Sequence, residues 1–154
     1  MGDSQPEETP KERSDRELIE LLNEVRVALP GVQVLFAFLL AVPFATGWKR
    51  VTTFQKDAFF TAFVATTLSS IFLIAPSAFH RIGWRVANKE RIVRAGNTLT
   101  LAGLAFLAIA IESVVLLVTD YLFERTTAVV MTAVLGVGFV LVWLVWPLAA
   151  REER

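Results

Sequence analysis

One acidic side chain, that of Glu112, lies well inside a long apolar stretch of this 154-residue sequence. Acids within a membrane span are costly and usually face a bundle interior or a water-filled cavity. Such a carboxylate can bind a proton or a cation, and the alternative is a carboxyl group with a packing or hydrogen-bonding role alone. No Lys, Arg or His inside the apolar stretches is available as its partner. Small residues on much the same helix face predict a closely packed surface around the acid; they are Thr98, Ala102, Ala105 and Ala108.

Four hydroxyl side chains form a second polar group at the centre of another apolar stretch: Thr66, Thr67, Ser69 and Ser70. Hydroxyls in a membrane helix can line a polar pathway, and together with Glu112 they make a candidate ion or proton site. More often they bond to the backbone carbonyl one turn earlier or hold two helices together. Small residues at every fourth position favour this packing interpretation; they are Ala62, Thr66 and Ser70, and, in the last apolar stretch, Ala128, Thr132 and Gly136.

Other chemistries find little support in the residue types. The chain has no cysteine, which excludes disulfides, thiolate metal sites and thiol catalysis. His80 is the only histidine, and a single histidine cannot build a metal site, although it can titrate near neutral pH. No nucleophile elbow, phosphate-binding loop or zinc signature occurs. We therefore expect a protein that is not an enzyme, needs no metal or cofactor, and has no nucleic-acid partner.

Four transmembrane helices are needed to position these groups. Apolar residues make up 55% of the chain, and its charged residues fall mostly into short clusters between long apolar runs. A transmembrane helix needs about 20 predominantly apolar residues to cross a hydrocarbon core of about 30 Å. Runs near that length cover residues 27–46, 58–79, 97–119 and 126–149. Pro76 lies one turn before the end of the second run, where it removes a backbone hydrogen bond and is expected to kink the helix.

A polar segment precedes the first span. Residues 1–9 are polar without an apolar period, which is typical of a disordered tail. Thr9, Pro10 and Glu12 have the types and spacing of an N-cap, a first helical residue and a capping box. The stretch 10–29 then predicts an amphipathic helix that ends or bends at Pro30. The predicted fold class is all-α, with a four-helix transmembrane domain over residues 30–154 preceded by a cytoplasmic amphipathic helix.

The distribution of Lys and Arg predicts one orientation in the membrane. Eleven of these residues flank the two termini and the loop between the second and third spans, against four on the opposite side. Because cytoplasmic flanks carry the excess of basic residues, we expect both termini and the central loop in the cytoplasm. The N-terminal helix is acidic through Glu17, Glu20 and Glu24, and it either docks on the central loop or is solvated independently of it. The basic residues around that loop are Arg81, Arg85, Lys89, Arg91 and Arg94.

Three segments carry the most distinctive motifs: ETPKERSDRELIELLNEVRVALPGVQVLFAFLL at residues 8–40, APSAFHR at 75–81 and KERIV at 89–93. Together they resemble a family of small, uncharacterised bacterial membrane proteins that is common in actinobacteria. The resemblance implies four helices in the bacterial cytoplasmic (inner) membrane and no defined function, although some members carry the automatic label sodium:proton antiporter. It marks signature positions without giving them roles: Leu22, Arg26, Pro30, Gly31, Gln33, Pro76, His80 and Arg81.

Two classes of function fit these features. The first is a structural or accessory protein of the lipid bilayer, which packs with itself as a homo-oligomer or with other membrane-protein subunits. The alternative is a small oligomeric transporter or channel for ions or protons that uses Glu112; four helices enclose little space, so its pathway would need several subunits. The small-residue stripes, the charged N-terminal helix and the lack of a catalytic set favour the structural class.

Overall fold

The computed structural model of the chain describes residues 9–83 and 89–152, and the regular elements within these ranges are helices. Four helices form an antiparallel bundle: α1 (Pro10–Ala41), α2 (Thr53–Gly83), α3 (Lys89–Leu122) and α4 (Arg125–Val140). Two 3-10 turns, η1 (Val42–Phe44) and η2 (Thr46–Arg50), join α1 to α2. α4 continues through a π-helical turn, η3 (Leu141–Val145), into α5 (Trp146–Glu152).

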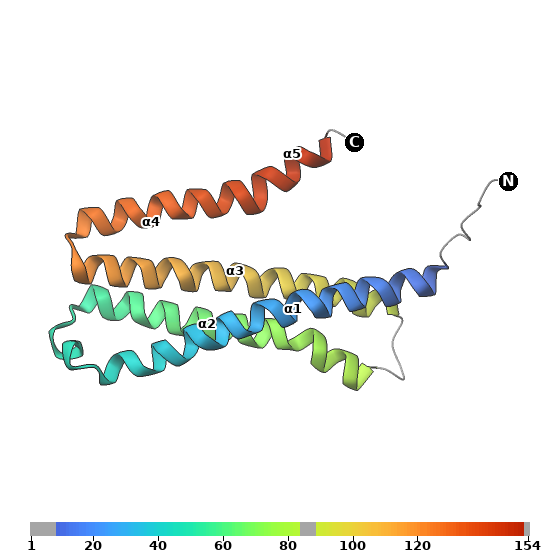
Figure 1. Cartoon of the computed structure of the whole chain (residues 1–154), viewed down its shortest axis with the longest axis horizontal. Coiled ribbons are helices and arrows are strands. Elements are labelled where there is room, and N and C mark those ends of the chain that lie inside the picture. The colour runs from blue at the N-terminus through green and yellow to red at the C-terminus, as the bar shows by residue number, and fades with distance from the viewer. Residues whose placement is uncertain (1–8, 84–88, 153–154) are drawn as a thin grey trace.

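Successive helices alternate in direction, so the bundle has two distinct ends (Figure 1). We call the end that holds the start of α1, the end of α2, the start of α3 and α5 the terminal end. The opposite end, with η1, η2 and the short connection between α3 and α4, is the turn end. This arrangement places the start of α1 and the last helix, α5, at the same end, as the predicted topology requires.

Four helical stretches are long and apolar enough to cross a membrane, so the chain is a multi-pass membrane protein. They cover Ile19–Phe44, Thr53–Ala78, Val93–Leu122 and Arg125–Ala149. The prediction of an all-α, four-helix bundle is therefore confirmed. The third stretch extends beyond residue 119, where the sequence analysis ended that span, and so includes Asp120.

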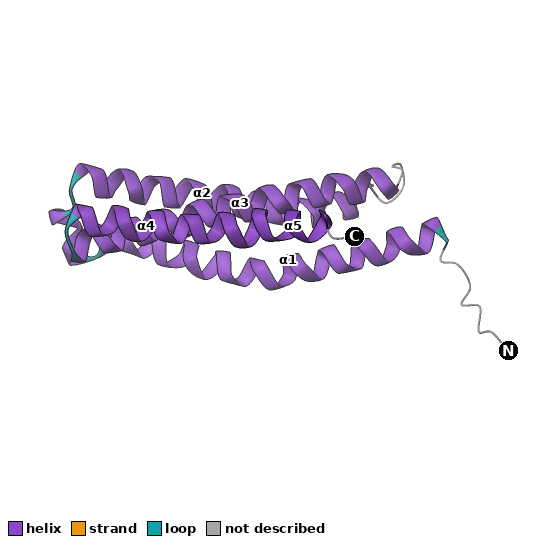
Figure 2. Cartoon of the chain, turned by 90° about the horizontal axis from the view of Figure 1, so that it is seen from above, coloured by secondary structure: helices purple, strands orange, loops and turns teal. Residues whose placement is uncertain are grey.

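The start of α1 is closed by the predicted capping box. The Glu12 backbone N–H donates to Thr9 Oγ1 at 3.4 Å, and the Thr9 backbone N–H donates to the Glu12 carboxylate at 2.9 Å. α1 then runs without interruption through Pro30, so the amphipathic segment and the first span form one helix of 32 residues. The expected helix end at this proline is absent. Pro30 is exposed, and α1 bends along its length (Figure 2), which is how a helix accommodates an internal proline.

α2 and α3 pack closely along their full lengths. Buried residues recur on each helix at steps of about three or four, the spacing of a coiled-coil seam. On α2 they include Ala58, Ala62, Ala65, Ser69, Leu73 and Pro76, and on α3 Gly96, Thr100, Gly103, Ala110, Ser113 and Leu117. Most of these residues are small, so the two backbones approach closely. A Cβ atom at Gly103 would lie 2.8 Å from Leu73 Cγ and 3.2 Å from the Leu73 backbone nitrogen, so this position requires glycine.

The N-terminal part of α1 is tied to this pair by apolar contacts. Leu21, Val25 and Val32 form one buried cluster with Leu73 of α2, and α3 side chains pack around it. Gly96 of α3 lies beside Leu21, since a Cβ atom there would be in ordinary van der Waals contact with that leucine, at 3.6 Å. The amphipathic segment of α1 therefore lies against α2 and α3 near their terminal ends.

α4 has a single neighbouring helix. It packs on α3, whereas η3 and α5 contact no helix of the described bundle outside their own continuous segment. Of the apolar stretch of the fourth span, 6% is buried within the chain, compared with 33% for the second span. Figure 1 shows α4 and α5 moving away from α3 toward the C-terminus. Most of the surface of the fourth span, and part of the surface of α3, is therefore not covered by the other described helices.

Candidate functional site

Glu112 lies on α3 at its contact with α4. Both carboxylate oxygens are buried, and neither accepts a hydrogen bond from a described residue. Gly136 of α4 lies opposite, because a Cβ atom there would be 4.0 Å from Cδ and Oε1 of Glu112. The Thr132 hydroxyl, one turn earlier on α4, is also buried and without a partner among the described residues. The acid is therefore half-buried against a small-residue surface that makes no hydrogen bond to its buried oxygens, an energetically costly environment.

The α4 stripe that the sequence predicted provides this surface. Ala128 is fully buried against α3, and Thr132 and Gly136 are half-buried. The four-residue spacing places all three on one side of α4, so a narrow helix face of small side chains meets α3. This stripe explains why Glu112 can fit at the contact between the two helices.

The α3 face that carries Glu112 is covered by α4 on one side of this residue and is exposed on the other. Residues at steps of three or four share this face, which we call the Glu112 face: Thr98, Leu101, Ala105, Ala108, Glu112, Leu116 and Thr119. Toward the turn end, Leu116 and Thr119 are half-buried, but toward the terminal end Thr98, Leu101 and Ala105 are exposed. Of the small residues predicted to pack around the acid, Ala102 and Ala108 are half-buried, whereas Thr98 and Ala105 are exposed because α4 diverges from α3 toward the terminal end.

The hydroxyl cluster of α2 does not join Glu112. Thr66, Thr67 and Ser70 each donate to the carbonyl four residues earlier, at 2.7, 2.8 and 3.0 Å. Ser69 lies buried on the α2–α3 seam, and its hydroxyl has no partner among the described residues. Since Glu112 faces α4 instead, the structure does not bring together the five residues of the predicted ion or proton site. Their bonding pattern is the local one that the sequence analysis favoured.

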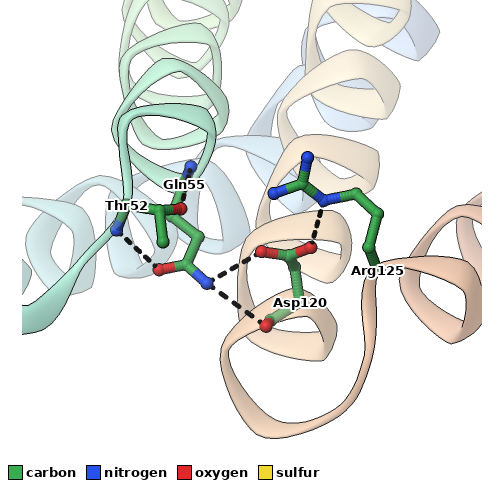
Figure 3. Close-up of polar contacts among 4 residues, drawn as sticks. All are labelled: Thr52, Gln55, Asp120 and Arg125. Atoms are coloured by element: carbon green, nitrogen blue, oxygen red, sulfur yellow. Dashed lines mark hydrogen bonds and ion pairs between the residues drawn. The ribbon is translucent and has the colours of Figure 1, made fainter.

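A different polar cluster occupies the turn end (Figure 3). The Asp120 carboxylate accepts a hydrogen bond from Gln55 Nε2 at 2.8 Å and an ion-paired one from Arg125 Nε at 2.7 Å. Gln55 Nε2 also donates to the Asp120 backbone carbonyl at 3.2 Å. Gln55 and Asp120 are buried, whereas about half of the Arg125 side chain is exposed. The buried acid is thus fully engaged by its neighbours, in contrast to Glu112.

Two further contacts fix this cluster in place. The Thr52 backbone N–H donates to Gln55 Oε1 at 3.1 Å, and the Gln55 backbone N–H donates to Thr52 Oγ1 at 3.3 Å, which makes a capping box at the start of α2. The Arg125 guanidinium stacks on the Phe54 ring, 3.7 Å from its centroid. We call Thr52, Gln55, Asp120 and Arg125 the turn-end clasp. It joins the start of α2 to the end of α3 and the start of α4.

The turn-end clasp was not predicted from the sequence. Thr52 and Gln55 have capping-box spacing, and Asp120 precedes Arg125 by five residues, so both local signals were present. The link between Gln55 and Asp120 joins residues 65 positions apart, which no local pattern reveals. Because Asp120 was assigned to a loop, its burial was also unforeseen.

The predicted signature residues lie in different environments. Leu22 is half-buried; Arg26, Pro30, Gly31 and Gln33 are exposed on α1, and Pro76 is buried on the α2–α3 seam. His80 and Arg81 have side chains outside the described part of the structure. The same holds for Arg85, Lys89 and Arg91 of the basic loop region, whereas Arg94 is described and exposed.

Two of the acidic residues of the N-terminal segment, Glu17 and Glu20, form ion pairs with residues of their own helix. Arg13 pairs with Glu17 at 3.0 Å and Arg16 pairs with Glu20 at 3.6 Å, each at four-residue spacing on the exposed surface of α1. Docking of this segment on the basic loop stays a prediction, because most of that loop lies outside the described residues. Within the described ranges, no group of three or more His, Cys, Asp or Glu side chains is placed to hold a metal ion.

Comparison with known proteins places the chain in a family. The chain belongs to the family of unknown function DUF6328, whose model matches residues 7–147. This confirms the predicted resemblance to an uncharacterised family, and the match covers the first three spans and the fourth as far as residue 147. Neither the curated proteins nor the solved structures gave a match.

Proposed function

We propose that this family member is a non-enzymatic structural or accessory protein of the bacterial cytoplasmic membrane, which binds other membrane-spanning helices through α3 and α4. The observation that carries the proposal is the single neighbour of α4: the fourth span packs on α3 alone and leaves both helices uncovered toward the terminal end. The uncovered part of α3 and the diverging segment from α4 to α5 therefore present two apolar surfaces at an angle to each other. An additional helix can pack against these surfaces, which a closed four-helix bundle would cover with its own helices.

The chemistry of the uncovered surface supports a protein partner. Lipid tails are as apolar as leucine, so helices associate in a membrane through close packing of small residues and through hydrogen bonds. The exposed half of the Glu112 face offers small side chains at Thr98 and Ala105, and a carboxylate without donors at its border. These are the features by which one membrane helix binds another.

The proposed orientation has both termini in the cytoplasm. Eleven Lys and Arg residues flank the termini and the α2–α3 connection, against four at the turn end. The start of α1, the end of α2, the start of α3 and α5 lie at one end of the bundle, so the charge bias applies to a single face of the membrane.

The assembly state tests this proposal. The protein is extracted from its own membrane in mild detergent, and the mass of the complex is measured by size-exclusion chromatography with light scattering. We expect a particle of larger mass than one 17.1 kDa chain, and we expect Ala105→Trp to reduce that mass because the indole fills the uncovered face. Ile71→Trp, at an exposed position of α2, is the matched control and should leave the particle intact. A single chain under all mild conditions would contradict the proposal.

Ion or proton transport is the second candidate, and the buried, unpartnered Glu112 carboxylate is the observation that favours it. Intramembrane acids of this kind often bind protons or cations along a pathway. Purified protein in liposomes is therefore tested for proton and sodium flux under imposed gradients, with Glu112→Gln as the variant. Flux that requires Glu112 would make transport the function, whereas its absence under every gradient would leave the accessory role alone.

A further inference from the structure

The divergence of α4 from α3 begins close to Glu112. Gly136, which faces the acid, lies four residues before the end of α4, and the π-helical turn η3 follows directly at Leu141–Val145. The Trp146 backbone N–H bonds to the Leu141 carbonyl, a five-residue step that changes the direction of the following side chains. Beyond this point neither η3 nor α5 contacts α3. We call the opening between the terminal half of α3 and the segment η3–α5 the wedge.

The two walls of the wedge differ in character. The wall on α3 is the uncovered half of the Glu112 face, with the exposed residues Thr98, Leu101 and Ala105. The wall on η3 and α5 carries large exposed apolar side chains, among them Leu144 and Leu148. A helix inserted here would meet Thr98, Leu101 and Ala105 on one side and large apolar side chains on the other, and the small residues Thr98 and Ala105 favour close approach of its backbone.

Glu112 lies at the border of the wedge, and both of its carboxylate oxygens lack a hydrogen-bond donor from the described residues. The side chain as a whole is half-buried, on the same helix face as the exposed Leu101 and Ala105. A lipid tail offers no hydrogen-bond donor. A second copy of this chain does not offer a base either, because Lys, Arg and His are absent from the central parts of its spans. An acid in a membrane is matched best by a base on a neighbouring helix.

We propose that the wedge binds one transmembrane helix of a different membrane protein, and that this helix carries a Lys or Arg side chain at the depth of Glu112. The inference rests on the proposed accessory function and specifies the chemistry of the partner. The basic side chain donates to the carboxylate that α4 leaves without a donor. The small residues of the Glu112 face allow the partner backbone to come close enough for this contact.

A designed helix serves as the probe. Its sequence is a membrane-spanning Leu–Ala host with one Lys, placed about four residues beyond the midpoint, at the depth of Glu112 in its own span. The control peptide has Leu at that position. The full-length protein carries a donor fluorophore on Glu124→Cys, a unique thiol because the natural chain has no cysteine, and binding to acceptor-labelled peptide is measured by energy transfer in liposomes.

The Lys peptide should bind the wild-type protein about tenfold more tightly than the Leu peptide. Glu112→Gln should remove this difference, and Ala105→Trp should weaken both peptides while Ile71→Trp weakens neither. Equal affinities of the two peptides, or an unchanged preference in Glu112→Gln, would overturn the inference. If the peptides show no preference but the extracted complex still contains partner chains, the accessory function stands and the proposed charge pairing alone is wrong. Thermal denaturation of each variant confirms that it is folded.

Discussion

Replacement of Glu112 by methionine should stabilise the protein. The substitution keeps the length of the side chain but removes two buried oxygens that have no donor among the described residues. A buried polar group without a partner costs about 1–3 kcal/mol, so Glu112→Met should raise the free energy of unfolding by about 2 kcal/mol. For a chain of this size 1 kcal/mol corresponds to about 2–4 °C, so Tm should rise by about 4–8 °C.

Thermal denaturation in detergent, followed by the helical circular dichroism signal, measures this shift. Glu112→Gln is the first control, because it keeps two polar atoms in the same place and should give little gain. Ile109→Met is the second control; it introduces methionine at an exposed position of the same helix and should leave Tm unchanged. A lower Tm for Glu112→Met would refute the reasoning, since it would mean that the carboxyl makes stabilising bonds.

The outcome also bears on function. Residues that lower stability are common in proteins, and their replacement costs function where the activity needs the destabilised site. A positive shift for Glu112→Met would therefore strengthen both readings of the acid, as a partner-binding group and as an ion site. The peptide-binding and flux measurements then separate the two.

Three further outcomes follow from the packing. Asp120→Ala should lower the free energy of unfolding by about 2–3 kcal/mol in thermal denaturation, because two charge-assisted bonds of the turn-end clasp are lost. Gly103→Val should destabilise the α2–α3 pair, and Leu73→Ala in the same chain should recover part of the loss, since the added Cβ clashes with that leucine. The Thr9 backbone N–H, bonded to the carboxylate, holds the pKa of Glu12 below its ordinary value, so the capping box should be intact above the unfolded pKa and open as pH falls through the lower, folded one; amide exchange in the first turn of α1 measures this.

Each of these outcomes has a contradicting result. An unchanged Tm for Asp120→Ala would mean that the clasp contributes nothing to stability. Full stability of Gly103→Val alone would mean that the helices can separate without cost. Amide exchange that responds equally to pH in Glu12→Gln, which cannot titrate at this position, would show that another group controls the start of α1.

Local patterns were sufficient for the elements of this fold. Hydropathy and length decide which segments span a membrane, because every backbone polar group in lipid must be satisfied within the helix itself. The capping box at Thr9 and Glu12 and the backbone bonds of Thr66, Thr67 and Ser70 are equally local, since donor and acceptor lie within four residues. The sequence also singled out Glu112 through its apolar surroundings.

Contacts between distant segments were decided by the tertiary structure. Pro30 does not end α1, because helical residues on both sides of it pack against α2 and α3 and outweigh one lost backbone bond. Gln55 and Asp120 meet only because α2 and α3 run antiparallel with a fixed register. Glu112 was recognisable from its residue type within an apolar stretch. The packing of α4 on α3 determines that Gly136 faces it and that half of its helix face is exposed. Residue types specify where each helix forms, because hydropathy and backbone hydrogen bonding act over a few residues, whereas contacts between segments far apart along the chain select the helix faces that pack together.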